Sequence, residues 1–82
     1  MSHALAALRA AEARDQAVYE VVVACLPRGT RGGRRKAQLL AAWPARHPDT
    51  PCPTALAFNQ SLQRLREQGR LFYDSRAGWT WQ

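Results

Sequence analysis

The apolar period of the chain changes at Gly69, and this change constrains the fold more than any other feature. Before the glycine, apolar residues recur at steps of three and four positions, as on one face of a helix. They are Phe58, Leu62 and Leu65, with Ser61 beside them. After the glycine, two runs rich in aromatic side chains, 70–73 and 79–81, flank the short turn 74–78. The sequence therefore predicts a helix followed at once by a β-hairpin.

Capping residues mark both ends of that helix. Thr54 follows Pro53 and is a good N-cap, because its side-chain oxygen can accept a hydrogen bond from a free backbone N–H of the first turn. At the other end, Gly69 suits the left-handed backbone that commonly closes a helix. We therefore place this helix at about 54–68.

A long helix is expected at the start of the chain, from Ala4 to Leu26, where Pro27 ends it. Its apolar residues form two stripes, namely Leu5, Leu8 and Ala11, and then Val18, Val21, Val22 and Cys25. Asp15 lies between the stripes. This residue either caps a second helix or lies exposed on one continuous helix, and we favour the continuous helix.

A short second helix is expected from about Arg34 to Trp43, because Pro44 cannot continue the backbone hydrogen bonding. Its inward residues are expected to be Ala37, Leu40 and Ala41. The glycine-rich loop 28–33 precedes this helix and has room for one pair of extended residues. A rigid turn with four prolines, residues 44–53, follows it.

Length and charge limit the functions of such a chain. Eighty-two residues support a single core, so we expect one domain over 1–82, with 1–15 as an N-terminal extension of the first helix. Twelve basic and six acidic residues give a net charge of +6, so polyanions are the natural partners. No stretch approaches the ~20 apolar residues of a membrane span, and no secretory signal is visible. We expect a cytoplasmic protein without a membrane partner, associated with the nucleoid if it binds DNA.

Neither a catalytic nor a metal-binding arrangement can be recognised. Cys25 and Cys52 lack the paired spacing of a zinc site and are expected to be reduced, with buried structural thiols favoured over a disulfide or redox role. His3 and His47 are isolated from any Ser, Cys or carboxylate arrangement. We therefore expect no enzyme, no cofactor and no metal site.

The order helix, basic loop, short helix, turn, helix and hairpin resembles the winged helix-turn-helix domains of bacterial and phage repressors. Their motif is a leucine pair three apart, a glycine four later and an aliphatic residue two beyond, here Leu62, Leu65, Gly69 and Leu71. The resemblance covers about residues 16–82. It implies an α+β, mostly α fold of three helices and a C-terminal β-hairpin wing. The proline-rich turn before the third helix departs from the tight turn of those repressors.

A narrower comparison is with Z-DNA-binding winged helices. Asn59 precedes Gly69 by that family's interval, and a tryptophan, Trp79 or Trp81, lies on the second wing strand. Gln63 stands where that family has a tyrosine, and the wing prolines are absent. We therefore favour the repressor-like comparison.

The third helix carries the side chains expected to read bases. Gln60 and Gln63 lie opposite the core face, and Asn59 and Arg64 flank them. Asn, Gln and Arg are the residue types that make bidentate contacts to adenine and guanine edges in the major groove. The alternative is an ordinary solvated helix face.

Cations elsewhere are expected to contact the DNA backbone. Five of them lie within residues 28–36 with no acid among them, and the resemblance implies that this segment and the wing 70–82 lie against phosphates. The predicted backbone contacts are Arg28, Arg31, Arg34, Arg35, Lys36, Thr54, Arg70 and Arg76. The alternative is a solvated basic loop.

Two functions fit these features. The first is sequence-specific binding of double-stranded DNA by a small transcriptional regulator or repressor, a homodimer through the Leu5 and Leu8 stripe. The second is a protein–protein interaction module with an acidic partner, such as a small phage-encoded inhibitor or adaptor of host machinery. Leu56, on the exposed side of the third helix, fits either a thymine-methyl contact or a protein-binding patch. Together with the exposed N-terminal stripe, it slightly favours the second function. A third function, single-strand or RNA binding, requires exposed aromatics on the hairpin, whereas we expect most aromatic area in the core.

Overall fold

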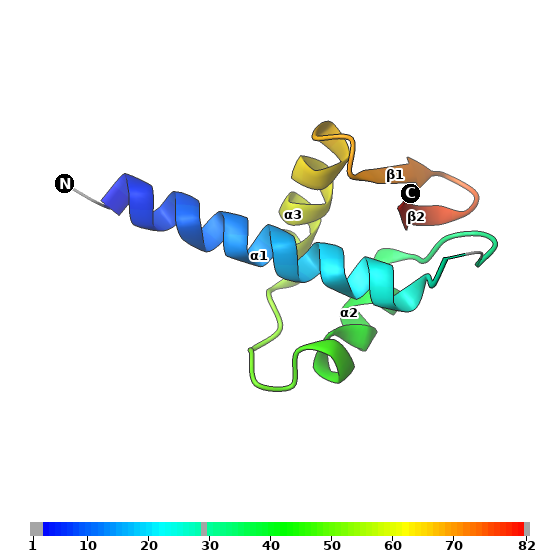
Figure 1. Ribbon diagram of the computed structural model, residues 1–82, viewed down its shortest axis with the longest axis horizontal. Coiled ribbons are helices and arrows are strands. Elements are labelled where there is room, and N and C mark those ends of the chain that lie inside the picture. The colour runs from blue at the N-terminus through cyan, green and yellow to red at the C-terminus, as the bar shows by residue number, and fades with distance from the viewer. Residues whose placement is uncertain (1–2, 29, 82) are drawn as a thin grey trace.

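The computed structural model describes residues 3–28 and 30–81. The ends of the predicted N-terminal extension and wing, residues 1–2 and 82, lie outside this range, as does residue 29 of the predicted loop. The elements are α1 (His3–Cys25), α2 (Lys36–Arg46), α3 (Ala55–Glu67), β1 (Leu71–Asp74) and β2 (Gly78–Trp81). This is the predicted α+β, mostly α layout of three helices and a C-terminal hairpin. The first turns of α1 extend beyond the rest of the molecule (Figure 1).

One hydrophobic cluster joins all five elements. Its buried members are Val18, Val21, Val22, Leu26, Leu39, Trp43, Phe58, Leu62, Leu65, Leu71 and Trp79. The predicted inner face of α3 is therefore confirmed, including Ser61, and so are the valines of α1. Removing this apolar area from water is the main force that holds the helices to the hairpin.

The first helix is continuous through Asp15, as favoured from the sequence. The expectation that Asp15 lies exposed on it is wrong, because the residue is only 6% exposed. Its carboxylate accepts hydrogen bonds from Arg64, a residue 49 positions later in the chain. A charged group can be buried at this point because an ion pair satisfies it.

The second helix differs from the prediction in both its bounds and its inner face. It begins at Lys36, contains Pro44 and ends at Arg46. Leu39 and Trp43 are buried, whereas the expected inward residues Ala37 and Ala41 are exposed and Leu40 is half-buried.

Burial of two large side chains four positions apart fixes the rotation of α2. Pro44 lies in the last turns, where its missing N–H removes one bond and the helix still closes through His47 N–H to the Trp43 carbonyl at 2.8 Å. The indole Nε1 of Trp43 donates to the Thr50 carbonyl at 2.9 Å, which ties the proline-rich turn to the core.

The caps of α3 are confirmed. Thr54 Oγ1 accepts a hydrogen bond from the Ala57 backbone N–H at 3.1 Å. Gly69 has a φ of 75°, and the Arg70 N–H reaches back to the Leu65 carbonyl at 2.9 Å. This closure turns the chain directly from α3 into the wing.

The hairpin is antiparallel, with Leu71 opposite Trp81 and Tyr73 opposite Trp79. Trp79 also pairs with Arg34 through two backbone hydrogen bonds, of 3.0 and 2.8 Å. Arg34 is therefore extended, whereas the sequence predicted it as the first residue of the second helix and placed the extended pair within 28–33. Gly78 makes room for this bridge, because a Cβ at its φ of 94° would lie 2.5 Å from the Arg34 carbonyl oxygen. The start of α2 is therefore fixed to the wing.

Within residues 3–28 and 30–81, no helix is both long enough and apolar enough to cross a membrane.

Candidate nucleic-acid interface

A polar groove opens where the start of α2, the outer side of α3 and the hairpin meet. Its lining residues are Arg35, Lys36, Ala37, Asn59, Gln63, Arg66, Tyr73 and Trp79. Three of these side chains are cationic, two carry amides and none is acidic. The groove thus gathers positive charge and hydrogen-bonding groups from three separate elements.

The groove side of α3 is formed by Asn59, Gln63 and Arg66, spaced four and three residues apart, so that they share one side of the helix. Asn59 and Gln63 are half-buried and Arg66 is exposed. Arg66 was not among the sequence-predicted site residues. Its spacing from Gln63 is the signal that could have identified it.

The structure does not place Arg64 with these residues. Arg64 lies on the α1 side of α3, where its Nε donates to Asp15 Oδ2 at 2.8 Å and its Nη2 donates to Oδ1 at 2.7 Å. Gln60 is exposed on α3 but does not line the groove. Of the four predicted base-reading residues, Asn59 and Gln63 therefore share the groove with cations of α2.

The Asp15–Arg64 pair is electrostatically matched. Burial alone would raise the pKa of Asp15, but hydrogen bonds from Arg64 and Ser61, with the charge of Arg64, outweigh it and leave that pKa lowered. The hydrogen bond from Arg64 to Asp15 in turn raises the pKa of Arg64. The pair stays ionised at neutral pH and fixes the side of α3 that faces away from the groove.

The side chain of Arg35 is hydrogen-bonded to the turn of the wing. Its Nη1 donates to the Ser75 carbonyl at 3.0 Å and its Nη2 donates to the Arg76 carbonyl at 2.8 Å, both in the turn of the hairpin. Its backbone N–H donates to Gln38 Oε1 at 2.8 Å. Arg35 thus joins the start of α2 to the wing turn while it lines the groove.

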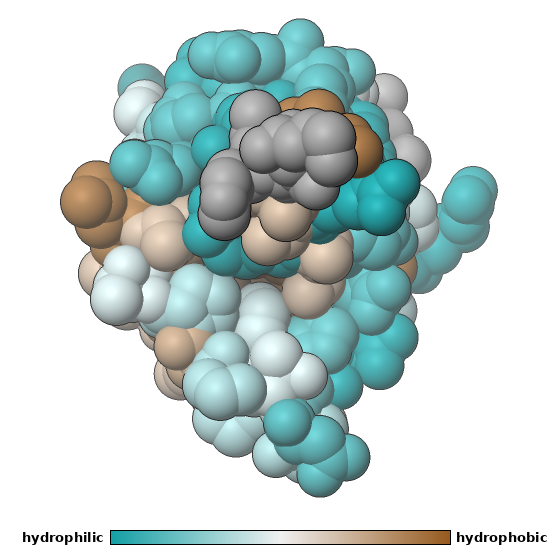
Figure 2. All heavy atoms as spheres, turned by 90° about the vertical axis from the view of Figure 1, so that its left-hand side faces the viewer, coloured by the Kyte–Doolittle hydropathy of each residue, from teal (hydrophilic) through white to brown (hydrophobic). Residues whose placement is uncertain are grey.

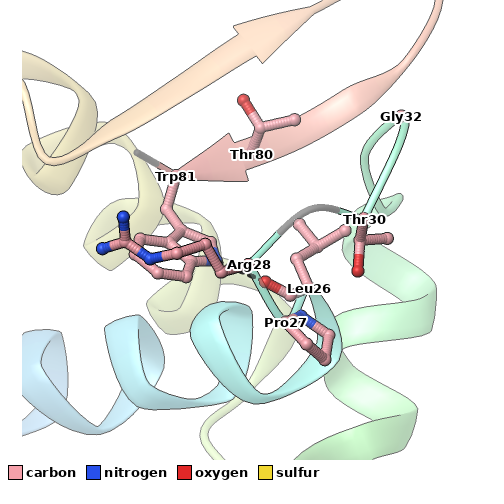
Figure 3. Close-up of a pocket in the computed structure, with 7 residues that line it drawn as sticks. All are labelled: Leu26, Pro27, Arg28, Thr30, Gly32, Thr80 and Trp81. Atoms are coloured by element: carbon pink, nitrogen blue, oxygen red, sulfur yellow. Dashed lines mark hydrogen bonds between the residues drawn. The ribbon is translucent and has the colours of Figure 1, made fainter.

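The other cations of residues 28–36 that were predicted to contact the DNA backbone have different surroundings. The Arg28 guanidinium lies over the Trp81 ring, 5.8 Å from its centroid (Figure 3). Arg34 is half-buried, and its Nη1 donates a hydrogen bond to the Gly33 carbonyl at 3.1 Å. Arg31 is exposed in the loop, and Lys36 is exposed at the groove. Of these four cations, Lys36, the first residue of α2, is the one that lines the groove with the amides of Asn59 and Gln63.

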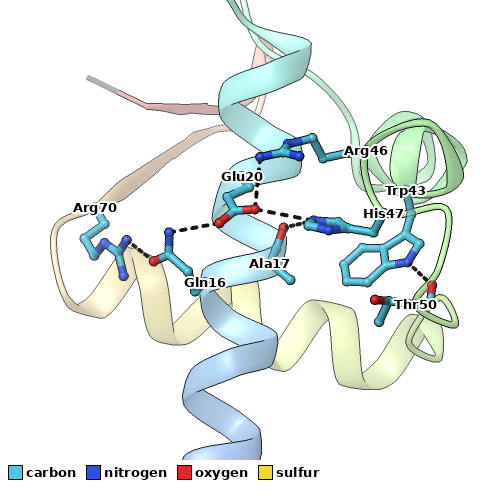
Figure 4. Close-up of polar contacts among 8 residues, drawn as sticks. All are labelled: Gln16, Ala17, Glu20, Trp43, Arg46, His47, Thr50 and Arg70. Carbon is cyan, nitrogen blue, oxygen red and sulfur yellow. Dashed lines mark hydrogen bonds and ion pairs between the residues drawn. The ribbon is translucent and has the colours of Figure 1, made fainter.

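Two of the remaining predicted contacts, Thr54 and Arg70, already have partners within the domain. Thr54 is the N-cap of α3. Arg70 donates to Gln16 Oε1 at 2.9 Å and lies 4.3 Å from the centroid of the Tyr19 ring. Figure 4 shows that this contact begins a polar chain through Gln16 and Glu20 to Arg46, on the α1 side. Arg76 is exposed at the wing turn.

The aromatic residues divide between core and surface. Trp43 and Trp79 are buried and Trp81 is half-buried, in line with the expected core role. Phe72 and Tyr73 are instead 41% and 42% exposed. Of these two, only Tyr73 lines the groove.

Comparison with protein-family models, with curated proteins and with solved structures gave no significant match.

Proposed function

We propose that this domain binds double-stranded DNA sequence-specifically, as a small transcriptional regulator, with α3 in the major groove. The observation that carries the proposal is the shared groove, in which the amides of Asn59 and Gln63 stand beside Lys36 and Arg66. Amide side chains can hydrogen-bond to base edges, and cationic side chains can contact phosphates. A surface that binds duplex DNA needs both kinds of side chain side by side, as in this groove. The net charge of +6 adds a long-range attraction to DNA.

The roles divide by position. Asn59, Gln63 and the neighbouring exposed Gln60 read bases, whereas Lys36, Arg66 and Arg76 contact the backbone. The Asp15–Arg64 pair sets the rotation of α3, and Arg35 holds the wing turn to the start of α2. Arg35 and Arg64 therefore act as positioning residues in this proposal.

The test is fluorescence anisotropy with mixed-sequence duplex DNA over a salt series. Loss of one phosphate contact makes the negative slope of log K against log salt concentration shallower by about 0.9. We expect this change in Lys36→Gln. The matched control is Arg46→Gln, which removes the same charge from a residue paired with Glu20 on the α1 side. Equal losses in the two variants would indicate a diffuse effect of net charge.

A second test addresses base reading. Native protein is used to select a preferred sequence from a random duplex pool, and binding to selected and scrambled duplexes is compared. We expect Asn59→Ala/Gln63→Ala to lose most of the preference and to keep the affinity for the scrambled duplex, because amides specify and cations supply affinity. If no preference can be selected with the native protein, the sequence-specific part of the proposal is wrong.

A protein partner is the second candidate function, and exposed apolar side chains favour it. Leu5, Leu8 and Leu56 are 49%, 55% and 68% exposed. An apolar hollow between α1, the proline-rich turn and the start of α3 is lined chiefly by alanines and prolines, with Trp43. Viewed from the end where α1 begins, tan and brown patches interrupt the hydrophilic surface (Figure 2). Pull-down with the Leu56→Ser variant as control tests this alternative.

A further inference from the structure

Tyr73 of the wing lies beside the α3 side chains of the groove. Its ring centroid is 5.0 Å from that of Trp79, and the guanidinium carbon of Arg66 is 5.9 Å from the Tyr73 ring centroid. Tyr73 is 42% exposed, whereas Trp79 beneath it is 4% exposed. A buried indole thus supports the tyrosine ring, and the ring in turn lies against the arginine.

The neighbouring Phe72 provides an internal comparison. Residues opposite each other across a hairpin point to the same face, so Tyr73 shares the core-facing side with Trp79. Phe72 pairs with Thr80 and points to the other face. The two aromatic side chains are equally exposed, but only Tyr73 reaches the groove with Asn59 and Gln63.

We propose that Tyr73 and Arg66 together hold one phosphate of the DNA strand that runs through the groove. This inference rests on the proposed DNA-binding function and adds Tyr73 to the phosphate contact already assigned to Arg66. The phenol hydroxyl donates to a phosphate oxygen, and the guanidinium that lies over the same ring supplies the opposite charge.

The geometry suits such a contact because the Arg66 guanidinium already lies over the Tyr73 ring, which in turn packs on Trp79. Arg66 is near the end of α3 and Tyr73 is on β1, and the Gly69 cap joins the two elements within a few residues. A phosphate held between them fixes how far the wing stands from α3. The contact therefore sets the depth at which Asn59 and Gln63 meet the bases.

The experiment measures duplex affinity and its salt slope for Tyr73→Phe, Arg66→Gln and the double variant, with Phe72→Leu as the matched control. Loss of one hydrogen bond to a phosphate weakens binding by roughly fivefold in Tyr73→Phe. We expect Arg66→Gln to make the salt slope shallower by about 0.9. The double variant should lose less than the sum, because both groups hold the same phosphate. Phe72→Leu should bind as the native protein does.

The outcomes separate the two levels of the proposal. If Tyr73→Phe binds duplex as tightly as the native protein does, the phosphate contact is refuted and the DNA-binding proposal still stands. A Tyr73→Phe variant that binds normally, together with a Tyr73→Ala variant that fails on single strands, would show base stacking instead. Absence of duplex affinity in the folded native protein refutes both levels. Far-UV circular dichroism of each variant shows that the fold is retained.

Discussion

Arg64 of α3 donates two hydrogen bonds to the carboxylate of Asp15 in α1, at 2.8 and 2.7 Å. The same region holds Ser61 Oγ, which accepts from Arg14 Nε at 3.2 Å. These contacts join α1 to the side of α3 opposite the groove. Because a helix is rigid over three turns, fixing this side also fixes the direction of Asn59 and Gln63.

We predict that Asp15→Asn lowers the free energy of unfolding by about 2 kcal/mol, since the variant leaves the Arg64 charge without its ionic partner. Urea denaturation followed by circular dichroism measures the change. Glu12→Gln, an exposed carboxylate of the same helix, is the control and should change stability by less than about 0.5 kcal/mol. Equal stabilities of native protein and Asp15→Asn would mean that the pair does not hold the helices together.

The same carboxylate should make stability depend on pH. The pKa of Asp15 is lowered in the folded protein from its ordinary value of 3.8, so the unfolded chain binds the proton more tightly. The stability due to Asp15 is therefore complete above that ordinary value and is lost as pH falls through the lower folded value. Urea midpoints between pH 6 and the acid limit of folding should fall more for native protein than for Asp15→Asn. Parallel curves would contradict this assignment.

Arg35→Lys separates positioning from charge. Lysine keeps the positive charge but lacks the planar fork that bonds the Ser75 and Arg76 carbonyls together. We expect weaker duplex binding with an unchanged salt slope, and faster amide hydrogen exchange in the wing turn. Lys36→Arg is the control and should retain affinity. Native affinity and native hydrogen exchange in Arg35→Lys would mean that the guanidinium fork does not position the wing turn.

The exposed start of α1 is predicted to join two copies. Leu5 and Leu8 are about half exposed and belong to the first turns of α1. These turns extend beyond the rest of the molecule (Figure 1). An operator with two half-sites requires a dimer, and this stripe is an exposed apolar surface of the described part of α1. Sedimentation equilibrium should show a dimer for the native protein and a monomer for Leu5→Ser/Leu8→Ser with the same helix content. A native monomer at tens of micromolar would rule out this dimer.

Local signals explain why α3 and the wing could be predicted from the sequence. Thr54, Gly69 and the change of period all act within a few residues, and each has the expected structural role. The start and rotation of α2 could not be predicted in this way. They depend on packing of Leu39 and Trp43 against the other helices, which outweighs the helix-ending tendency of Pro44.

In the candidate site, too, local features could be predicted from the sequence and long-range contacts could not. Asn59, Gln63 and Lys36 were expected from residue type and helix position, and they share the groove. The pairing of Arg64 with Asp15 joins residues 49 positions apart, and nothing local to either residue indicates it. Arg66 could have been identified from its spacing to Gln63. Tyr73 was expected in the core, and its place beside Arg66 depends on how closely the wing folds back toward α3.

The most direct test of the central claim is amide chemical-shift mapping of the labelled domain during titration with duplex DNA. We predict that the largest changes fall on the groove residues Lys36, Asn59, Gln63, Arg66 and Tyr73. The α1 side, represented by Gln16 and Glu20, should change little. Changes concentrated on the start of α1 or around Leu56, or no change at saturating duplex and low salt, would contradict DNA binding through this groove.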